Sequence, residues 1–176
     1  GYPFTLGVAS GDPDATSVVL WTRLAPDPLA GGGMPDADID VLWEASGAPE
    51  FTEIAASGIV TAGAEHGHTL HVLAALEPGE WYFRFRVGEH TSPVGRTHVA
   101  PGADEPVEGV RFAAASCQNY AAGHYAAHRD IAEQQPDFLV WLGDYIYESA
   151  GAADADADDR LHLGPEPTDV ETYRNR

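Results

Sequence analysis

Residues 81–87 read WYFRFRV, and their side chains alternate strictly between two kinds. The odd-numbered positions hold aromatic or aliphatic residues, whereas the even-numbered positions hold a tyrosine and two arginines. Successive side chains of an extended chain point to opposite faces, so this pattern is typical of a β-strand with one buried face.

The sequence on either side of this stretch shows further short strand-like runs separated by turns. Glycine- and proline-rich turn signals separate further short runs that are rich in β-branched and aromatic residues. These runs are residues 4–9, 17–23, 39–45, 51–61, 68–76 and 94–99. About seven short strands without a convincing helix predict an all-β sandwich of the immunoglobulin or fibronectin kind over residues 1–100. Trp21, Trp43 and Trp81 occupy strand positions and are expected in its core.

A change of pattern follows residues 101–109 (PGADEPVEG), a polar stretch with two prolines that we interpret as a domain linker. Residues 110–116 and 137–143 are short apolar runs, and residues 123–135 between them have helical spacing. Strand, helix and strand in this order predict one βαβ unit with parallel strands. A single unit cannot bury both faces of its sheet, so we expect the sheet to need partners from outside residues 110–176.

Potential metal ligands follow both predicted parallel strands. Cys117 comes directly after the first strand, and Asp144 comes directly after the second. Because ligands bind at the carboxyl ends of strands in open α/β sheets, the two side chains are expected at one sheet edge. Tyr147 lies three residues further along, within reach of the same place. Thiolate, carboxylate and phenolate are all anionic, which favours a highly charged cation such as ferric iron.

The same three residues also have ordinary structural interpretations. An aspartate after Gly143 can simply stabilise a turn, and a tyrosine can pack as an amphipathic side chain. Cys117, the single cysteine, can be a small buried apolar residue. The residue pattern alone therefore leaves a metal site and a structural role both open.

Several motifs together resemble a known family. Residues 4–26 (FTLGVASGDPDATSVVLWTRLAP) resemble the start of the β-sandwich domain of the PhoD-like alkaline phosphatases. Residues 112–120 (FAAASCQNY) and 137–148 (DFLVWLGDYIYE) resemble the first two motifs of the metallophosphoesterase domain of that family. Residues 160–166 (RLHLGPE) and 171–176 (ETYRNR) resemble the stretch that follows. The resemblance covers almost the whole chain, with the motifs in the same order.

The resemblance implies a centre with Fe3+ and Ca2+. Cys117 and Tyr147 would bind iron, and Asp144 would bridge iron to calcium. The usual metallophosphoesterase pattern opens with Asp-x-His, whereas Ser116, Cys117 and Gln118 stand at that place here, as in the PhoD branch. The remaining ligands and the catalytic residues are expected beyond residue 176. Residues 110–176 would then be the beginning of an α/β metallophosphoesterase domain.

The reaction that the resemblance implies is hydrolysis of phosphomonoesters or phosphodiesters by a metal-activated hydroxide that attacks phosphorus. Phospholipid head groups are among the candidate substrates, which would make the enzyme phospholipase D-like. The implied protein is secreted, and its C-terminal remainder completes the site, either in one chain or as a separate chain after cleavage. Residues 1–176 alone are expected to be inactive.

The charge balance excludes some partner classes. Nine Lys and Arg residues against 28 Asp and Glu residues give a net charge of −19. Electrostatic binding to nucleic acid requires a basic face, so we exclude it as a structural partner. No apolar run is long enough to span a membrane. A phosphate-bearing substrate would be repelled unless bound cations reverse the local field.

A different class of function remains open, namely a non-catalytic β-sandwich that binds another molecule, because sandwiches serve many binding roles.

Near the end of the chain, Thr168 and Glu171 have the spacing of a capping box that starts a helix. The chain stops two turns later, so we expect Arg176 to be a break made by proteolysis, processing or the choice of the expressed segment. Counted from Asp154, the sixth position of a calcium loop would be Asp159 instead of glycine, and the twelfth would be Pro165 instead of glutamate. The acidic residues 150–159 are therefore interpreted as a solvated loop.

Overall fold

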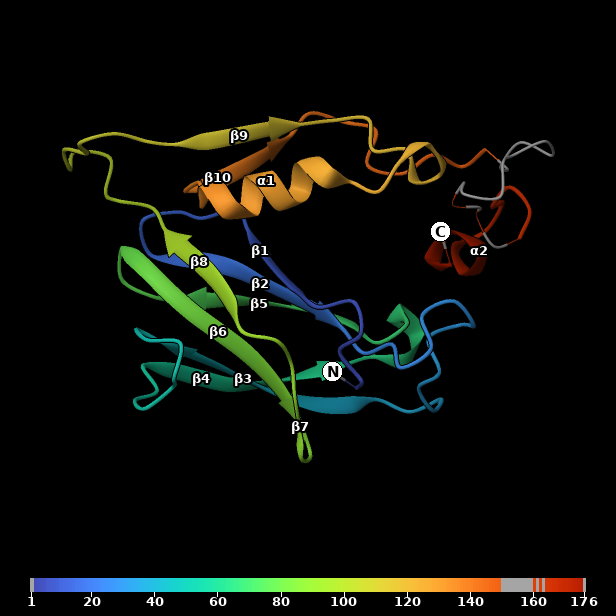
Figure 1. The fold of residues 1–176 in the computed structure, drawn as a ribbon. Helices are drawn as coiled ribbons and strands as arrows, with labels where there is room; N and C mark the ends of the chain where they lie inside the picture. Colours follow the sequence, from blue (N-terminus) through green and yellow to red (C-terminus); the bar gives the residue numbers. More distant parts are fainter. Residues whose placement is uncertain (1, 150–159, 161, 163, 176) are drawn as a thin grey trace. The chain divides into compact units, whose positions relative to one another are not determined.

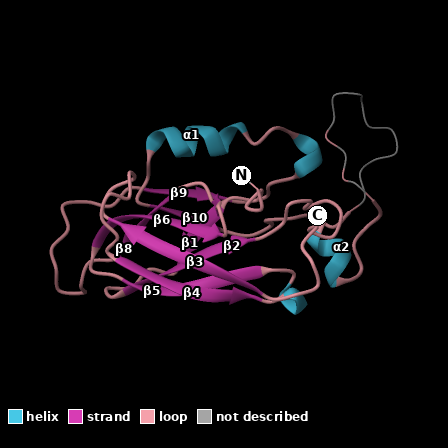
Figure 2. Ribbon diagram, turned by 90° about the horizontal axis from the view of Figure 1, so that it is seen from below, coloured by secondary structure: helices cyan, strands magenta, loops and turns pink. Residues whose placement is uncertain are grey.

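A computed structural model describes residues 2–149, 160, 162 and 164–175. Antiparallel and parallel strands dominate it, and helix is scarce (Figures 1 and 2). The chain divides into two compact units, Gly1–Pro106 and Val107–Arg176. Among the described residues, no helix combines the length and the apolar character that a membrane crossing requires.

The first unit consists of two antiparallel sheets. In the smaller sheet, β1 pairs with β2, which pairs with β5. In the larger sheet, β4, β3, β6 and β7 follow one another, and β8 also pairs with β6. The strands are β1 (Val8–Gly11), β2 (Ser17–Arg23), β3 (Ile39–Ser46), β4 (Ala56–Ala62), β5 (Thr69–Ala75), β6 (Gly79–Val87), β7 (His90–Thr91) and β8 (Gly95–Val99). A short 3-10 turn, η1 (Ala64–His66), precedes β5.

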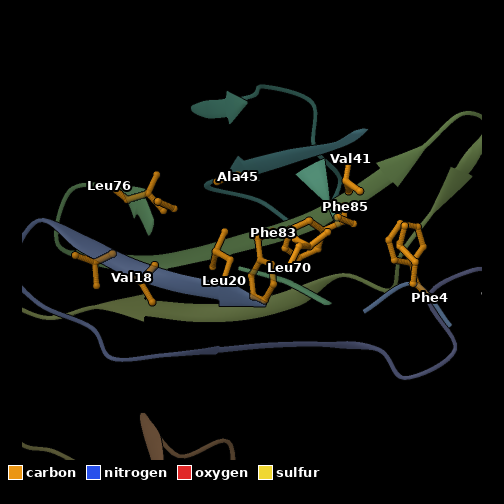
Figure 3. Close-up of a cluster of buried hydrophobic side chains, with 13 residues drawn as sticks. Phe4, Val18, Leu20, Val41, Ala45, Leu70, Leu76, Phe83 and Phe85 are labelled. Atoms are coloured by element: carbon orange, nitrogen blue, oxygen red, sulfur yellow. The ribbon is translucent and has the colours of Figure 1, made fainter. Parts of the chain in front are cut away.

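Both sheets supply side chains to a single core, as Figure 3 shows. Val18 and Leu20 of β2 meet Phe83 and Phe85 of β6 there, and all four are at most 1% exposed. Phe4, from the segment before β1, closes the same cluster. The alternation that the sequence predicted for residues 81–87 is confirmed, because only Phe83 and Phe85 of this stretch are fully buried.

The expectation for the tryptophans is wrong in part. Trp43 and Trp81 are half-buried and pack against the core, but Trp21 does not belong to it. The reason is the alternation along β2, which turns Leu20 and Thr22 inward and therefore turns Trp21 to the opposite face. The hydroxyl of Thr22 is buried without penalty because it donates a hydrogen bond to the Gly7 carbonyl, 2.8 Å away.

A close contact fixes β8 against β6. Gly95 lies opposite Phe83, and a methyl group added at Gly95 would lie 2.4 Å from the Phe83 ring and 2.9 Å from Val8. We expect Gly95→Ala to lower the stability of the first unit by about 1–3 kcal/mol, because an overfilled core forces side chains off their preferred rotamers. Urea unfolding measures this loss.

Gly11→Ala is the matched control for this prediction, since the added methyl would meet nothing within 4 Å at a second strand glycine. It should change stability by less than about 0.5 kcal/mol. Equal effects of the two substitutions would contradict the packing argument and point to a general backbone effect of replacing glycine.

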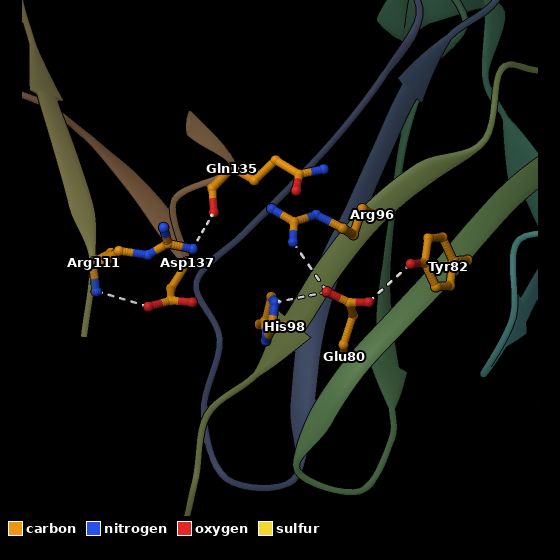
Figure 4. Close-up of polar contacts among 7 residues, drawn as sticks. All are labelled: Glu80, Tyr82, Arg96, His98, Arg111, Gln135 and Asp137. Carbon is orange, nitrogen blue, oxygen red and sulfur yellow. Dashed lines mark hydrogen bonds and ion pairs between the residues drawn. The ribbon is translucent and has the colours of Figure 1, made fainter. Parts of the chain in front are cut away.

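A polar cluster lies on the surface of β6 and β8 (Figure 4). The Glu80 carboxylate accepts hydrogen bonds from Tyr82 at 2.8 Å and Arg96 at 3.0 Å, and His98 lies 3.4 Å away. The hydrogen bond from Tyr82 is the largest of the causes that lower the pKa of Glu80. Because the group is exposed, this cluster contributes little stability and chiefly fixes the register of the two strands.

The second unit contains one parallel strand pair. Strands β9 (Phe112–Ala115) and β10 (Phe138–Trp141) lie side by side in register, and α1 (Ala126–Gln134) connects them. At the start of the pair, the Arg111 amide donates to Asp137 at 2.7 Å, and the Arg111 guanidinium donates to the Gln135 carbonyl (Figure 4). The predicted parallel strand–helix–strand order is therefore confirmed.

Helix boundaries in the second unit differ from the expectation. Helix α1 begins at Ala126 rather than at residue 123, because Tyr125 has a left-handed backbone with φ 53°. The last helix, α2 (Val170–Arg174), is capped by Asp169 with Thr172, not by Thr168 with Glu171. The predicted capping box was thus one residue too early. The acidic residues 150–159, interpreted as a solvated loop, lie outside the described residues.

The apolar side chains of the strand pair are exposed in this chain. Phe112 is 61% exposed and Phe138 is 45% exposed, and their rings stack on one another with centroids 5.5 Å apart. Leu142, just after β10, is 69% exposed. This exposure agrees with the expectation that the sheet needs partners from outside residues 110–176, because the described chain supplies no layer that covers these side chains.

Candidate metal centre

The ends of β9 and β10 are joined by a short backbone ladder that continues past the strands. The Leu142 amide donates to the Ala115 carbonyl at 2.8 Å, and the Cys117 amide donates to the Gly143 carbonyl at 3.1 Å. The Gln118 amide then donates to the Asp144 carbonyl at 3.2 Å. These bonds bring together two residues that are 27 positions apart in sequence.

Both residues have an unusual backbone. Cys117 has φ 58° and Asp144 has φ 52°, in the left-handed region that L-residues seldom adopt. Aspartate tolerates this region better than cysteine does, and each such residue costs of order 1–3 kcal/mol. Both belong to the three residues that the sequence suggested as metal ligands. Five other described residues outside glycine share this backbone, so the strain alone does not mark the site.

The side chains of the three predicted ligands converge on one carboxylate oxygen. Oδ2 of Asp144 accepts a hydrogen bond from the Tyr147 hydroxyl at 3.0 Å and lies 3.7 Å from the Cys117 sulfur. All three residues are solvent-accessible. The structure therefore brings together Cys117, Asp144 and Tyr147.

The protonation of Tyr147 reflects these neighbours. A hydrogen bond with Cys117 raises the pKa of the Tyr147 phenol above its ordinary value, and burial and the Asp144 carboxylate raise it further. The phenol therefore keeps its proton at neutral pH and donates a hydrogen bond to Asp144. A cation that binds here has to replace this proton, as is general for ligands that bind metals in their deprotonated form.

The donor set fits a highly charged cation. Thiolate, carboxylate and phenolate supply three negative charges when they bind a metal, and phenolate and thiolate are both established ligands of iron. Among the described residues, no group of three or more His, Cys, Asp and Glu side chains could hold a metal. The cluster at Asp144 has only two such residues, and Tyr147 is the third donor.

The sequence does not reveal one neighbour of this cluster, His128. The His128 ring Nε2 lies 2.9 Å from Oε1 of Gln118, the residue directly after Cys117. The His128 ring also stacks on Trp141, with centroids 5.7 Å apart. The sequence shows His128 only as half of an i, i+4 pair with His124, which suggested decoration of the helix surface. The contact with Gln118 depends on how α1 lies against the strand ends, so no local pattern reveals it.

Comparison with known proteins gives the same family for both units. The family model of the PhoD-like phosphatase N-terminal domain matches residues 1–101, and that of the PhoD-like phosphatase matches residues 112–176. Alkaline phosphatase D of Bacillus subtilis (strain 168) is 45% identical over 179 residues, which cover 99% of this chain and 31% of that protein. A solved structure of PhoD superposes with a TM-score of 0.95 at 45% identity, over 100% of this chain and 34% of that one. The chain thus spans about a third of the length of these relatives.

Proposed function

The chain belongs to the PhoD-like phosphatase family, and we propose that it is the N-terminal portion of a metal-dependent phosphoesterase. The observation that carries the proposal is the convergence of Cys117, Asp144 and Tyr147 at the ends of two parallel strands. A structural turn does not require a thiol and a phenol to lie beside the same carboxylate oxygen, whereas a metal centre does.

Within this proposal, the three ligands hold two metal ions. Cys117 and Tyr147 would hold Fe3+, and Asp144 would supply its carboxylate to both Fe3+ and Ca2+. When bound, the metals supply positive charge for the phosphate oxygens and lower the pKa of a water molecule. The short backbone ladder at the strand ends holds Cys117 beside Asp144, and the hydroxyl of Tyr147 is held by its hydrogen bond to Asp144. The catalytic residues and the other ligands are expected beyond residue 176.

The substrate class follows from the family alone. We propose phosphomonoesters or phosphodiesters, with phospholipid head groups among the candidates. The net charge of −19 over residues 1–176 disfavours the approach of a phosphate ester, and a cation at the site would offset this repulsion. We further propose that the protein acts outside the cell, and that the first unit is an immunoglobulin- or fibronectin-like sandwich followed by the beginning of a metallophosphoesterase domain.

The exposed apolar strand pair supports a partner for the second unit. Phe112, Phe138 and Leu142 would not remain in water in a stable domain, because their burial would gain about 25 cal/mol per Å². We propose that the C-terminal remainder of the same enzyme covers them, in one chain or after cleavage. The chain spans only 31% and 34% of its two relatives, so the relatives have enough further chain to do this.

The test is Cys117→Ala in the full-length gene product. We expect loss of iron and of phosphate-ester hydrolysis, while the first unit keeps its fold, because Cys117 contributes nothing to that core. Metal analysis, hydrolysis of p-nitrophenyl phosphate and its bis ester, and circular dichroism measure the three outcomes. Ser57→Ala, at an exposed position of β4 in the first unit, should leave iron and activity unchanged.

Normal iron content in Cys117→Ala would remove Cys117 from the ligand set. A full-length product that binds no metal and hydrolyses no phosphate ester would contradict the enzyme proposal as a whole. It would favour the alternative that the first unit, which has its own core, is a non-catalytic binding module.

A further inference from the structure

The connection from β9 to α1 is held by few contacts of its own. It runs from Cys117 to Tyr125 and includes a single 3-10 turn, η2 (Tyr120–Ala122), which has no buried residue. Within the turn, the Asn119 side chain accepts a hydrogen bond from the Ala121 amide at 3.0 Å. Such exposed local bonds compete with water and cannot by themselves hold a segment in one position.

Arg160 supplies further contacts from far along the chain, in addition to the His162 ring, whose centroid lies 5.0 Å from that of Tyr120. Its guanidinium carbon lies 4.3 Å from the ring centroid of Tyr120 and 4.4 Å from that of Tyr125. It also donates a hydrogen bond to the carbonyl of Gly123, which lies between the two tyrosines. One side chain thus contacts both ends and the middle of residues 120–125.

The stack shields part of the guanidinium from water. Nε of Arg160 is buried and has no hydrogen-bond partner among the described residues. A cation over an aromatic face is attracted more strongly when it is desolvated, so this contact is stronger than an exposed pair of the same kind. An arginine suits the place because its flat group can lie against two rings and still donate a hydrogen bond at its edge.

We propose that Arg160 is a positioning residue for Cys117, which acts by clamping the connection that follows it. The start of this connection is tied to the second strand end through the amides of Cys117 and Gln118. Its far end is tied by Arg160. Because Cys117 holds a strained left-handed backbone, it needs restraint on both sides to keep its sulfur near Asp144. This inference rests on the proposed function only in so far as Cys117 binds a metal.

The test compares variants in the full-length gene product after removal of metal. Arg160→Ala is expected to speed the hydrogen exchange of the backbone amides at least about tenfold from Cys117 to Tyr125. Tyr120→Leu with Tyr125→Leu should do the same, because both rings are lost. Tyr120→Phe with Tyr125→Phe should leave exchange as it is, because the ring faces remain. Arg160→Lys should give an exchange rate between those of the unsubstituted protein and Arg160→Ala, since lysine keeps the charge but not the flat group.

A second readout is iron affinity, measured by competition with a chelator. Outer-shell residues typically change metal affinity by about 10–100-fold, and we expect a loss in this range for Arg160→Ala. Unchanged exchange in Arg160→Ala, or equal damage from the Phe and Leu pairs, would overturn the clamp. Faster exchange confined to residues 119–125 with iron affinity intact would overturn the link to Cys117. If the unsubstituted protein binds no iron, the proposed function fails, while the exchange at Cys117 still decides whether Arg160 positions it.

Discussion

Asp144→Asn in the full-length gene product is expected to abolish metal binding and to lower phosphate-ester hydrolysis by more than about a hundredfold. Loss of an outer-shell partner alone costs about 10–100-fold, and Asp144 is proposed to contact both metals. Its carboxylate is the group on which Cys117 and Tyr147 converge. An amide has nearly the same shape but carries no charge, so it can neither compensate two cations nor bridge them.

The fold should survive this substitution. Asparagine adopts the left-handed backbone of residue 144 at least as readily as aspartate does, so no new strain arises. The matched control is Asp130→Asn, which removes the same charge from an exposed position on α1. Metal analysis and steady-state hydrolysis compare the two variants. Equal metal content in both would show that Asp144 is not a ligand, and equal losses would indicate a general effect of net charge.

Sequence reasoning works best where one pattern has one structural meaning. The alternation in residues 81–87 can be satisfied only by a strand with one buried face, and β6 is such a strand. The pattern is ambiguous near residue 169, where Thr168 and Asp169 are both good helix caps. The structure uses Asp169, whose side chain accepts from the Thr172 amide at 2.8 Å. Only the packing of the following residues can decide between two such registers.

In the candidate site, too, the features set by local sequence patterns were predictable and the contacts between distant residues were not. Two apolar runs with a helix between them predict neighbouring parallel strands, and this places Cys117 and Asp144 at one edge. The left-handed backbone at Cys117 was not predictable, because the preference of cysteine argues against it, whereas aspartate tolerates it at residue 144. The contact of Arg160 with Tyr120 and Tyr125 joins positions at least 35 residues apart, given by their numbers, and no short motif encodes it.

Phe85→Ala is expected to remove about 3–5 kcal/mol from the stability of the first unit. Phe85 is fully buried between the two sheets, and its ring contacts Phe83 edge to face with centroids 6.1 Å apart. The loss combines the transfer of a large apolar side chain with the cavity that remains. Because a domain of this kind is stabilised by only about 5–15 kcal/mol, the loss is a large fraction of the total, and the urea concentration at half-unfolding should fall accordingly.

Tryptophan fluorescence during urea unfolding measures this loss for the first unit alone if Trp141 is first replaced by phenylalanine. The other three of the four tryptophans, Trp21, Trp43 and Trp81, all lie in the first unit. Leu73→Ala is the control, because Leu73 is 67% exposed on β5 and its loss should cost less than about 0.5 kcal/mol. A small effect of Phe85→Ala would mean that the two sheets can close over the cavity. A large effect with an unchanged dependence on urea concentration would show that the first unit unfolds as one cooperative body around this core.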